Sequence, residues 1–222
     1  MIPPEADAEF VACMEDVLDV YERPYDPHCP VVNLDEQPVQ LVKETRQPLD
    51  GAPGHPRRYD HEYERAGTAC VFLVTEALAG WREVTVRPQR TAVDWAQEVA
   101  ALLEGRYAQA AKVLVICDQL NTHTIASLYK AFPPEQARRL AQRLEIHYTP
   151  KHGSWLNIAE CELSVLTRQC LRTRTASVSA LVGKVTPWAR GRNARQRGVH
   201  WHFQTKDARI KLKRLYPEVQ LS

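Results

Sequence analysis

Hydrophobic residues along the chain fall into two patterns, unbroken runs and positions three or four residues apart. The runs predict strands. One covers residues 31–35, ends in Asp35 and is halted by Pro38, and another covers residues 113–117 and is followed directly by Asp118. The other strand-like segments are residues 68–78 and 81–86, which Ala79-Gly80 joins as a hairpin, and residues 144–148. Residues 43–67 contain Pro and Gly without an apolar period and predict a long surface loop.

Positions three or four residues apart predict helices between and around these strands. The first helix lies within residues 5–21, and the second starts at Thr91, which with Asp94 has the spacing of a capping box. Further helices are expected after Asp118, from an N-cap at Ser154 to Cys170, and over residues 177–190. Because 222 residues suffice for one buried core, the alternation of strands and helices indicates a single α/β domain with short extensions.

The composition is ordinary for a soluble globular protein, with 44% hydrophobic and 25% charged residues. No apolar stretch approaches the roughly 20 residues that span a bilayer, and the acidic N-terminus lacks the basic start of a signal peptide. Six cysteines form no CxxC pair, and several lie in apolar runs, which indicates a reducing compartment. A cytoplasmic protein without membrane association is therefore expected.

Charge is distributed unevenly along the chain. Residues 190–214 hold nine lysine or arginine residues and one acid, Asp207, so this segment carries +8 and the remainder −6 within a formal net charge of +2. A basic segment beside a carboxylate-rich core favours an anionic partner, with nucleic acid the natural candidate. The alternative is a solvated final helix, in which Ala208, Ile210, Leu212 and Leu215 pack inward and the basic stems cover the surface.

Three acids stand where a carboxylate is costly. Asp35 and Asp118 end two apolar runs, and Glu160 lies on the flank of the apolar stripe of the helix that follows Ser154. A lone strand-terminal Asp is often a turn or helix cap, but three converging carboxylates are the ligands that hard divalent cations prefer. The order strand-Asp, hairpin, helix, strand-Asp, strand, helix-Glu is that of a ribonuclease H-like fold, a mixed central sheet flanked by helices.

The residues around these acids resemble the DDE endonuclease domain of mariner-like bacterial insertion-sequence transposases. The resemblance covers almost the whole chain. Its matching stretches are Asp35 to Leu41, Arg58-Tyr59-Asp60, Gly67-Thr68, Gly80-Trp81-Arg82, Arg90-Thr91, Cys117 to Thr124, Tyr148 to Glu160 and Asp207 to Leu212.

The resemblance implies a DNA transposase whose metal ligands and catalytic residues are Asp35, Asp118 and Glu160. It implies two Mg²⁺ or Mn²⁺ ions, cleavage and strand transfer at transposon ends, and transposon and target DNA as partners of a homo-oligomer. Such a protein would act in the bacterial cytoplasm, at the nucleoid when bound to DNA. Glu162 is the competing third acid, but we expect it to lie farther around the helix from the apolar stripe. Glu36 is expected to be a solvated neighbour of Asp35.

The sequence departs from the family pattern in two places. Gln119 stands where Asn usually follows the second Asp, which keeps an amide but lengthens its reach. The family also carries helix-turn-helix modules ahead of the catalytic domain, whereas 34 residues precede Asp35, so end recognition is expected to fall to a separately encoded helix-turn-helix subunit. The expected organisation is a linker helix in residues 1–28, the catalytic domain in 29–190 and a basic C-terminal extension packed on the core in 191–222.

Further residues are candidates for contacts around the metal site and with DNA. Asn121, His123 and Asn157 are candidates for hydrogen bonds to the groups around the metal, with helix capping as the alternative for Asn121 and Thr122. Lys151, Arg90 and Lys43 are candidates for neutralising phosphate charge. The predicted DNA-binding residues are Lys151, His152, Trp155, Arg192, Arg195, Arg197 and Lys211. Two other functions stay open: a ribonuclease H-like nuclease without strand transfer, and a non-catalytic relic that binds DNA.

Overall fold

The structure is a computed structural model that describes residues 5–46, 51–55, 61–195 and 197–218. Its helices are α1 (Ala8–Tyr21), α2 (Ala92–Glu104), α3 (Ile125–Ala131), α4 (Pro134–Gln142), α5 (Ile158–Cys170), α6 (Val178–Asn193) and α7 (Thr205–Lys211), with 3-10 turns η1 (Ser154–Leu156) and η2 (Lys213–Leu215). Its strands are β1 (Val31–Glu44), β2 (Tyr63–Glu76), β3 (Trp81–Arg87), β4 (Val113–Cys117) and β5 (Leu144–Tyr148). The predicted residues Arg58, Tyr59 and Asp60 lie outside the described ranges.

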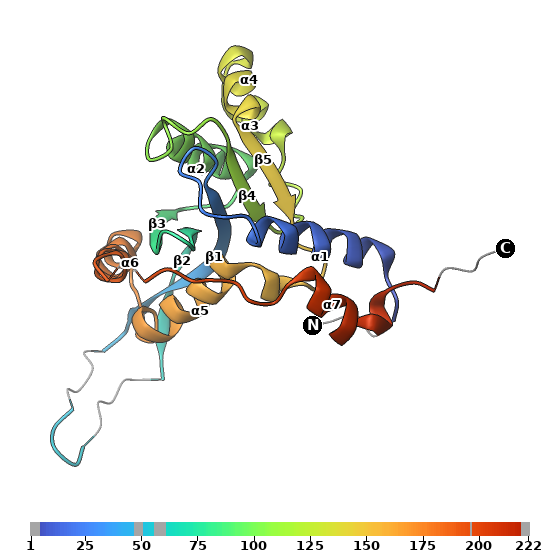
Figure 1. The fold of residues 1–222 in the computed structure, drawn as a ribbon. Helices are drawn as coiled ribbons and strands as arrows, with labels where there is room; N and C mark the ends of the chain where they lie inside the picture. Colours follow the sequence, from blue (N-terminus) through green and yellow to red (C-terminus); the bar gives the residue numbers. More distant parts are fainter. Residues whose placement is uncertain (1–4, 47–50, 56–60, 196, 219–222) are drawn as a thin grey trace.

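Within the described residues, five strands form one mixed sheet in the order β3-β2-β1-β4-β5 (Figure 1). β1 pairs antiparallel with β2, and β2 with β3, whereas β4 runs parallel to both β1 and β5. β1 is therefore the central strand, and its parallel pairing with β4 covers only Val31 to Asn33. Because parallel strands end at the same sheet edge, residues that follow β4 come close to the middle of β1.

Helices cover both faces of the sheet (Figure 1). Successive side chains of a strand point to opposite faces. Leu34 and Val115 therefore pack with α2, α3 and α4, whereas Leu114 and Leu73 belong to the face covered by α1, α5 and α6. Each buried aliphatic side chain contributes roughly 1.5–3 kcal/mol to stability. The sheet and its two helical layers thus confirm the predicted mixed α/β architecture.

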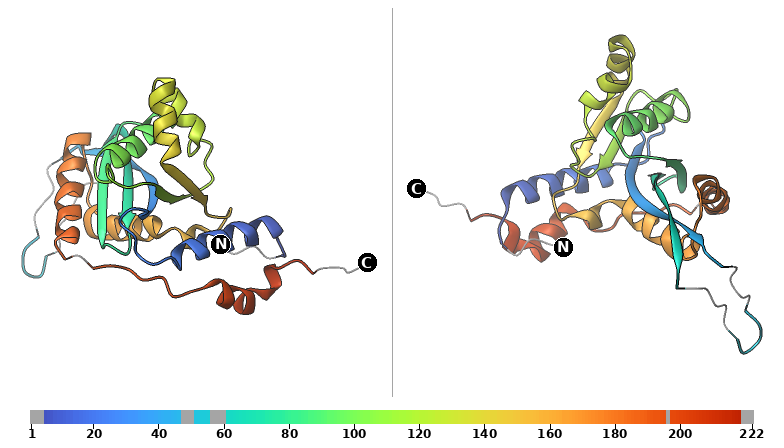
Figure 2. Two further views of the ribbon diagram at one scale, coloured as in Figure 1. Left: turned by 45° about the horizontal axis from the view of Figure 1, so that its top comes forward. Right: turned by 180° about the vertical axis from the view of Figure 1, so that it is seen from behind.

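The C-terminal segment runs back along α1 (Figure 2). The Asp7 backbone N–H donates to the Leu215 carbonyl at 3.0 Å, and Ala208 and Leu215 are fully buried against Phe10 and Met14 of α1. Ile210, which was expected to pack inward, is 77% exposed, because two residues along α7 turn it to the side opposite buried Ala208. The basic segment is thus fixed to the core by alternate apolar residues of α7 and η2.

Two predicted boundaries around β1 are wrong. Pro38 does not end the strand, which continues to Glu44 and pairs Pro38 with Cys70 of β2. β4 pairs with β1 only as far as Asn33, so at position 38 no strand lies on the side of β1 away from β2. A proline, which lacks an N–H, is tolerated there because no hydrogen bond to a neighbouring strand is lost. The predicted loop over residues 43–67 is also wrong at both ends, because β1 and β2 pair out to Glu44 and Tyr63 and form the projecting arm of the sheet, while residues 47–50 and 56–60 lie outside the described ranges (Figure 1).

The helix α2 begins at the predicted capping box. Thr91 Oγ1 accepts from the Asp94 backbone N–H at 3.2 Å, and Asp94 Oδ2 accepts from the Thr91 N–H at 2.8 Å. We expect Thr91→Ala to lower the free energy of unfolding by about 1 kcal/mol, because the Asp94 amide loses its acceptor and the Asp94 carboxylate loses the hydroxyl that donates to it. Urea denaturation measures the loss, and Thr91→Ser, which keeps the hydroxyl, is expected to stay near the wild type.

Candidate active site

The three predicted acids line one pocket of about 420 Å³. Asp35 lies on β1, where the alternation after buried Leu34 turns it toward α5. Asp118 follows the last residue of β4, and Glu160 lies in the first turn of α5. The remaining lining residues are Glu36, Gln37, Thr149, Ser154, Asn157, Leu163 and Ser164. Asp35 and Asp118 are 83 positions apart in the sequence, and Asp118 and Glu160 are 42 apart. The strand ends and the start of α5 bring them together at one pocket.

Asp35 is held by its own strand and by the start of α5. Its Oδ1 accepts from the Glu36 backbone N–H at 2.8 Å, and its Oδ2 lies 3.3 Å from Asn157 Nδ2. Burial raises the pKa of Asp35 to about 7, with further increases from the charges of Asp118, Glu36 and Glu160 and a partial offset from the Glu36 N–H. A carboxylate in this setting gains from a cation that neutralises the cluster.

The Asp118 carboxylate is held by a buried histidine, His123. Its Oδ1 lies 2.7 Å from His123 Nδ1 and 3.3 Å from the backbone nitrogen of Leu120. The His123 ring stacks on Trp95 with 5.6 Å between centroids and is 1% exposed. Burial lowers the pKa of His123, but hydrogen bonds to Asp118, Cys117 and Glu36 outweigh it and raise the pKa to about 12. His123, a predicted hydrogen-bond partner of the groups around the metal, thus contacts the candidate ligand Asp118 directly.

Glu36 is not the solvated neighbour that the sequence suggested. Its side chain is 2% exposed, and its Oε2 lies 3.2 Å from His123 Nε2. Arg90 Nη1 is 3.9 Å from the other oxygen and half exposed. Because Asp35 faces α5, strand alternation turns Glu36 to the opposite face, into the layer beneath α2 and α3. Glu36 is the functional candidate that the sequence interpretation missed.

Glu162 also lies elsewhere than expected. It is buried on α5, where it contacts Arg82 at 3.2 Å and Arg192 at 2.5 Å, instead of lying far from the apolar stripe. Glu160 is exposed and faces the pocket. The two arginines explain the burial, because they supply the charge that a carboxylate needs away from water. Of the two acids on α5, Glu160 is therefore the one available to a ligand in the pocket.

The oxygen donors of the pocket fit a hard divalent cation. Asp35, Asp118 and Glu160 would hold it, since such ions prefer carboxylate oxygens and relieve the repulsion that raises the pKa of Asp35. As placed, no three His, Cys, Asp or Glu side chains among the described residues are arranged around a single metal-binding centre. Asp118 is instead paired with His123, so the three acids share a pocket without converging on one point.

Asn157 links the helix to the strand that carries Asp35. Its side-chain oxygen accepts from the Ala159 backbone N–H at 3.0 Å and caps α5, while its Nδ2 lies 3.3 Å from the Leu34 carbonyl. The predicted N-cap, Ser154, instead begins the 3-10 turn η1. One amide thus fixes both the start of α5, which carries Glu160, and the strand beside Asp35.

The loop after Asp118 differs from its capping interpretation. α3 begins at Ile125 with Thr124 as its cap residue, whose side chain makes no capping bond, so Asn121 and Thr122 are not caps. Asn121 is exposed in the turn. Gln119, the residue that departs from the family pattern, donates to Cys13 Sγ of α1 at 3.5 Å and lines a separate small pocket.

The predicted DNA-binding residues do not form one surface. Lys151 and His152 are exposed in the turn after β5, and Lys151 lines the small pocket of Gln119. Trp155 is half-buried between Trp201 and Phe203, with ring centroids 6.3 Å and 5.8 Å away. Exposed positions are also found at Arg195, Arg197 and Lys211, whereas Arg192 binds Glu162.

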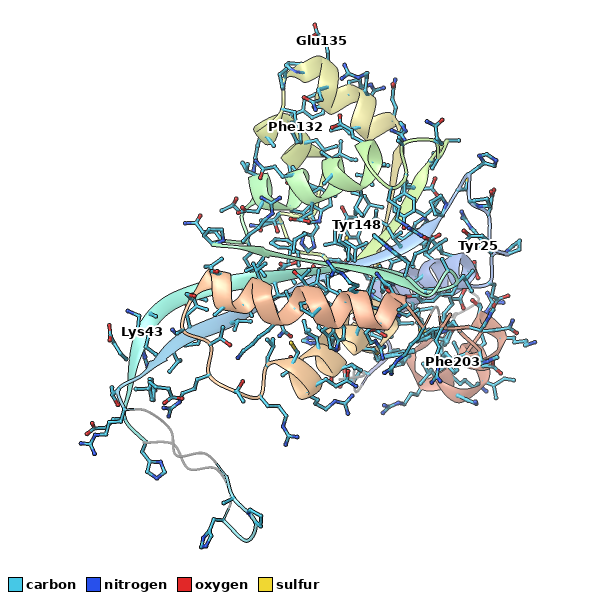
Figure 3. All side chains as sticks on the ribbon, turned by 90° about the vertical axis from the view of Figure 1, so that its left-hand side faces the viewer. Tyr25, Lys43, Phe132, Glu135, Tyr148 and Phe203 are labelled. Carbon is cyan, nitrogen blue, oxygen red and sulfur yellow. The ribbon has the colours of Figure 1, made fainter. Side chains whose placement is uncertain are left out.

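The two remaining phosphate candidates lie apart from each other. Lys43 lies on the projecting hairpin, where it pairs with Glu64 at 3.7 Å (Figure 3). Arg90 lies near the site, beside Glu36. Of these two, Arg90 is therefore the one that the structure places next to the acids.

Comparison with protein families identifies the domain. A model of the DDE superfamily endonuclease matches residues 30–182, which include all three acids. The chain belongs to the DDE superfamily endonucleases. Among curated proteins no match was found. The described helices include none long and apolar enough to cross a membrane.

Solved structures of a mariner transposase share the fold of this DDE domain. The Mos1 strand transfer complex aligns with a TM-score of 0.61 at 15% identity, covering 93% of this chain and 61% of that one. The Mos1 paired end complexes with Mn and with Mg each align with a TM-score of 0.57, at 15% and 16% identity, covering 98% of this chain and 66% of theirs. The predicted ribonuclease H-like fold is confirmed, and the chain spans about two thirds of the Mos1 length or slightly less.

Proposed function

We propose that this DDE domain cleaves DNA strands at transposon ends and joins them to target DNA, using two Mg²⁺ or Mn²⁺ ions. The observation that carries the proposal is that Asp35, Asp118 and Glu160 line the same pocket. The Mos1 structures with the same fold are a strand transfer complex and paired end complexes with Mn and Mg, which supports metal-dependent chemistry on DNA ends. The active species is proposed to be a homo-oligomer on DNA, with end recognition by a helix-turn-helix module.

The residues in and around the pocket are proposed to have different roles. Asp35, Asp118 and Glu160 would hold the cations, which when bound activate the attacking hydroxyl or water and stabilise the leaving oxygen of the phosphodiester. Asn157 keeps Asp35 and the start of α5 in register, and His123 fixes the Asp118 carboxylate. Lys151, His152, Arg195, Arg197 and Lys211 are exposed and are proposed to contact the DNA backbone.

A joining assay tests the proposal. The purified chain is incubated with a labelled precut duplex bearing a free 3′ hydroxyl, with supercoiled plasmid as target, and with Mg²⁺ or Mn²⁺. We expect nicking of DNA and joined product, with both lost in Asp118→Ala. Nicking without joining would favour the nuclease alternative. Neither product from a folded protein that binds DNA would favour the non-catalytic alternative.

A further inference from the structure

Three side chains form a line from the sheet interior to the pocket. Glu36 Oε2 lies 3.2 Å from His123 Nε2, and His123 Nδ1 lies 2.7 Å from Asp118 Oδ1. The imidazole therefore contacts one carboxylate through each of its two nitrogens. Glu36 belongs to β1 and Asp118 to the end of β4, so the line crosses between two strands.

The line spans the place where the two strands stop pairing. The last registered pair of β1 and β4 is Asn33 with Ile116, and both candidate ligands come two positions later. Backbone hydrogen bonds therefore do not set the spacing between Asp35 and Asp118. The contact from Glu36 to Asp118 through His123 bridges the gap, and Glu36 is the covalent neighbour of Asp35.

The histidine is held as a rigid part of the core. Its ring stacks on Trp95, its backbone N–H donates to the Leu120 carbonyl at 2.9 Å, and its own carbonyl accepts from the Tyr148 hydroxyl at 2.7 Å. With Glu36 at one nitrogen, the other nitrogen is directed at Asp118. His123 Nδ1 contacts both Asp118 Oδ1 and the Asp118 backbone carbonyl, the latter at 3.3 Å, and the Leu120 amide also uses Oδ1. Among the described residues no hydrogen bond or ion pair engages Oδ2, and Asp118 lines the pocket.

We propose that Glu36 and His123 are positioning residues, which together aim the second oxygen of Asp118 into the pocket and set its distance from Asp35. The inference rests on the proposed function, because it assigns Asp118 as a cation ligand. His123 does not line the pocket, and the carboxylate of Glu36, which does, lies against His123 Nε2 and Arg90. Partners of this kind orient ligands, and their loss typically weakens metal binding by about 10–100-fold.

The test is the Mg²⁺ affinity of the full chain, measured by calorimetry and by thermal denaturation over a Mg²⁺ series. We expect the Mg²⁺ affinity to fall by about 100-fold in His123→Gln, which removes one of the two contacts to Asp118 Oδ1. In Glu36→Gln we expect it to fall by about tenfold. Glu98→Gln is the matched control, because Glu98 is also a buried carboxylate paired with an arginine, Arg87, but lies outside the pocket. It is expected to lower the melting temperature and to keep the wild-type Mg²⁺ affinity.

The outcomes separate the inference from the proposed function. A wild type whose Mg²⁺ response equals that of Asp118→Ala overturns the proposed function itself. A wild type that binds Mg²⁺, beside Glu36→Gln and His123→Gln with affinities within twofold of it, overturns the positioning roles alone. If His123→Gln does not fold, the near-isosteric Glu36→Gln decides, and recovery of its cleavage rate at saturating Mg²⁺ with unchanged KM for DNA supports positioning.

Discussion

Asp35→Asn is expected to abolish metal-dependent cleavage while stabilising the metal-free protein at pH 8. Burial and the neighbouring carboxylates raise the pKa of Asp35 to about 7, so at pH 8 the fold holds a charge that its surroundings disfavour. Asparagine has the same shape and no charge. It can still accept from the Glu36 N–H, but it is a poor ligand for a divalent cation.

The size of each effect follows from this environment. One pKa unit corresponds to about 1.4 kcal/mol, so the rise of the Asp35 pKa to about 7 sets an upper limit of about 4 kcal/mol. We expect a gain of about 2 kcal/mol, because Asn157 loses a charged acceptor. Loss of a metal ligand removes several kcal/mol of transition-state stabilisation, which corresponds to a cleavage rate at least about 10³-fold lower.

The stability gained by Asp35→Asn is expected to depend on pH. The folded-state pKa lies above the unfolded value of about 4, so protonated Asp35 favours the fold at low pH and this stability is lost as the pH rises through 7. The advantage of Asp35→Asn is therefore expected at pH 8 and to vanish near pH 4. Urea denaturation without metal at both values measures it. Asp26→Asn, an exposed position outside the pocket, should keep the Mg²⁺ response, and a destabilised Asp35→Asn at pH 8 would contradict the interpretation.

Most of the fold could be predicted because its signals are local. The runs ending at Asp35 and Cys117 and the capping box at Thr91 depend on neighbouring residues, and the structure contains each of them. The continuation of β1 through Pro38 could not be predicted. It depends on where the pairing with β4 stops, which is a property of the assembled sheet.

Two acidic side chains near the site, Glu36 and Glu162, lie where the sequence did not predict them. Glu36 is buried and not the solvated neighbour of Asp35, because alternation along β1 turns it away from Asp35 and into the α2 layer. Glu162 was misplaced for a different reason. Its partner Arg82 lies 80 positions away on β3, and no sequence pattern within α5 predicts that contact.

Glu162→Ala is expected to lower the free energy of unfolding by about 3–5 kcal/mol, because it leaves a buried arginine without its counter-charge. The Arg82 side chain is 3% exposed, and Asn193 holds both its backbone N–H, at 2.9 Å, and its carbonyl, at 2.7 Å. Its backbone is therefore fixed, and its guanidinium donates to the Gly80 carbonyl at 3.3 Å. Burial lowers the pKa of its guanidinium, and Glu162 supplies the opposing charge.

Two further variants serve as controls for the loss of stability expected in Glu162→Ala. Glu64→Ala removes the partner of Lys43, where both side chains are more than half exposed, and is expected to cost less than about 1 kcal/mol. The double variant Glu162→Leu with Arg82→Met replaces the buried pair by apolar residues and is expected to recover much of the loss. A single Glu162→Ala variant that unfolds like the wild type would show that Arg82 is solvated.

The same variant decides which acid of α5 serves the pocket, provided that stability and activity are measured together. Glu160 is exposed on the pocket side, so Glu160→Ala is expected to keep the wild-type free energy of unfolding and to lose Mg²⁺-dependent cleavage. Glu162→Ala is expected to show the reverse at temperatures where it remains folded, since Glu162 contacts arginines and not the pocket. If cleavage is lost in folded Glu162→Ala and retained in Glu160→Ala, the third ligand is Glu162, and the arginines at its carboxylate must move when the cation binds.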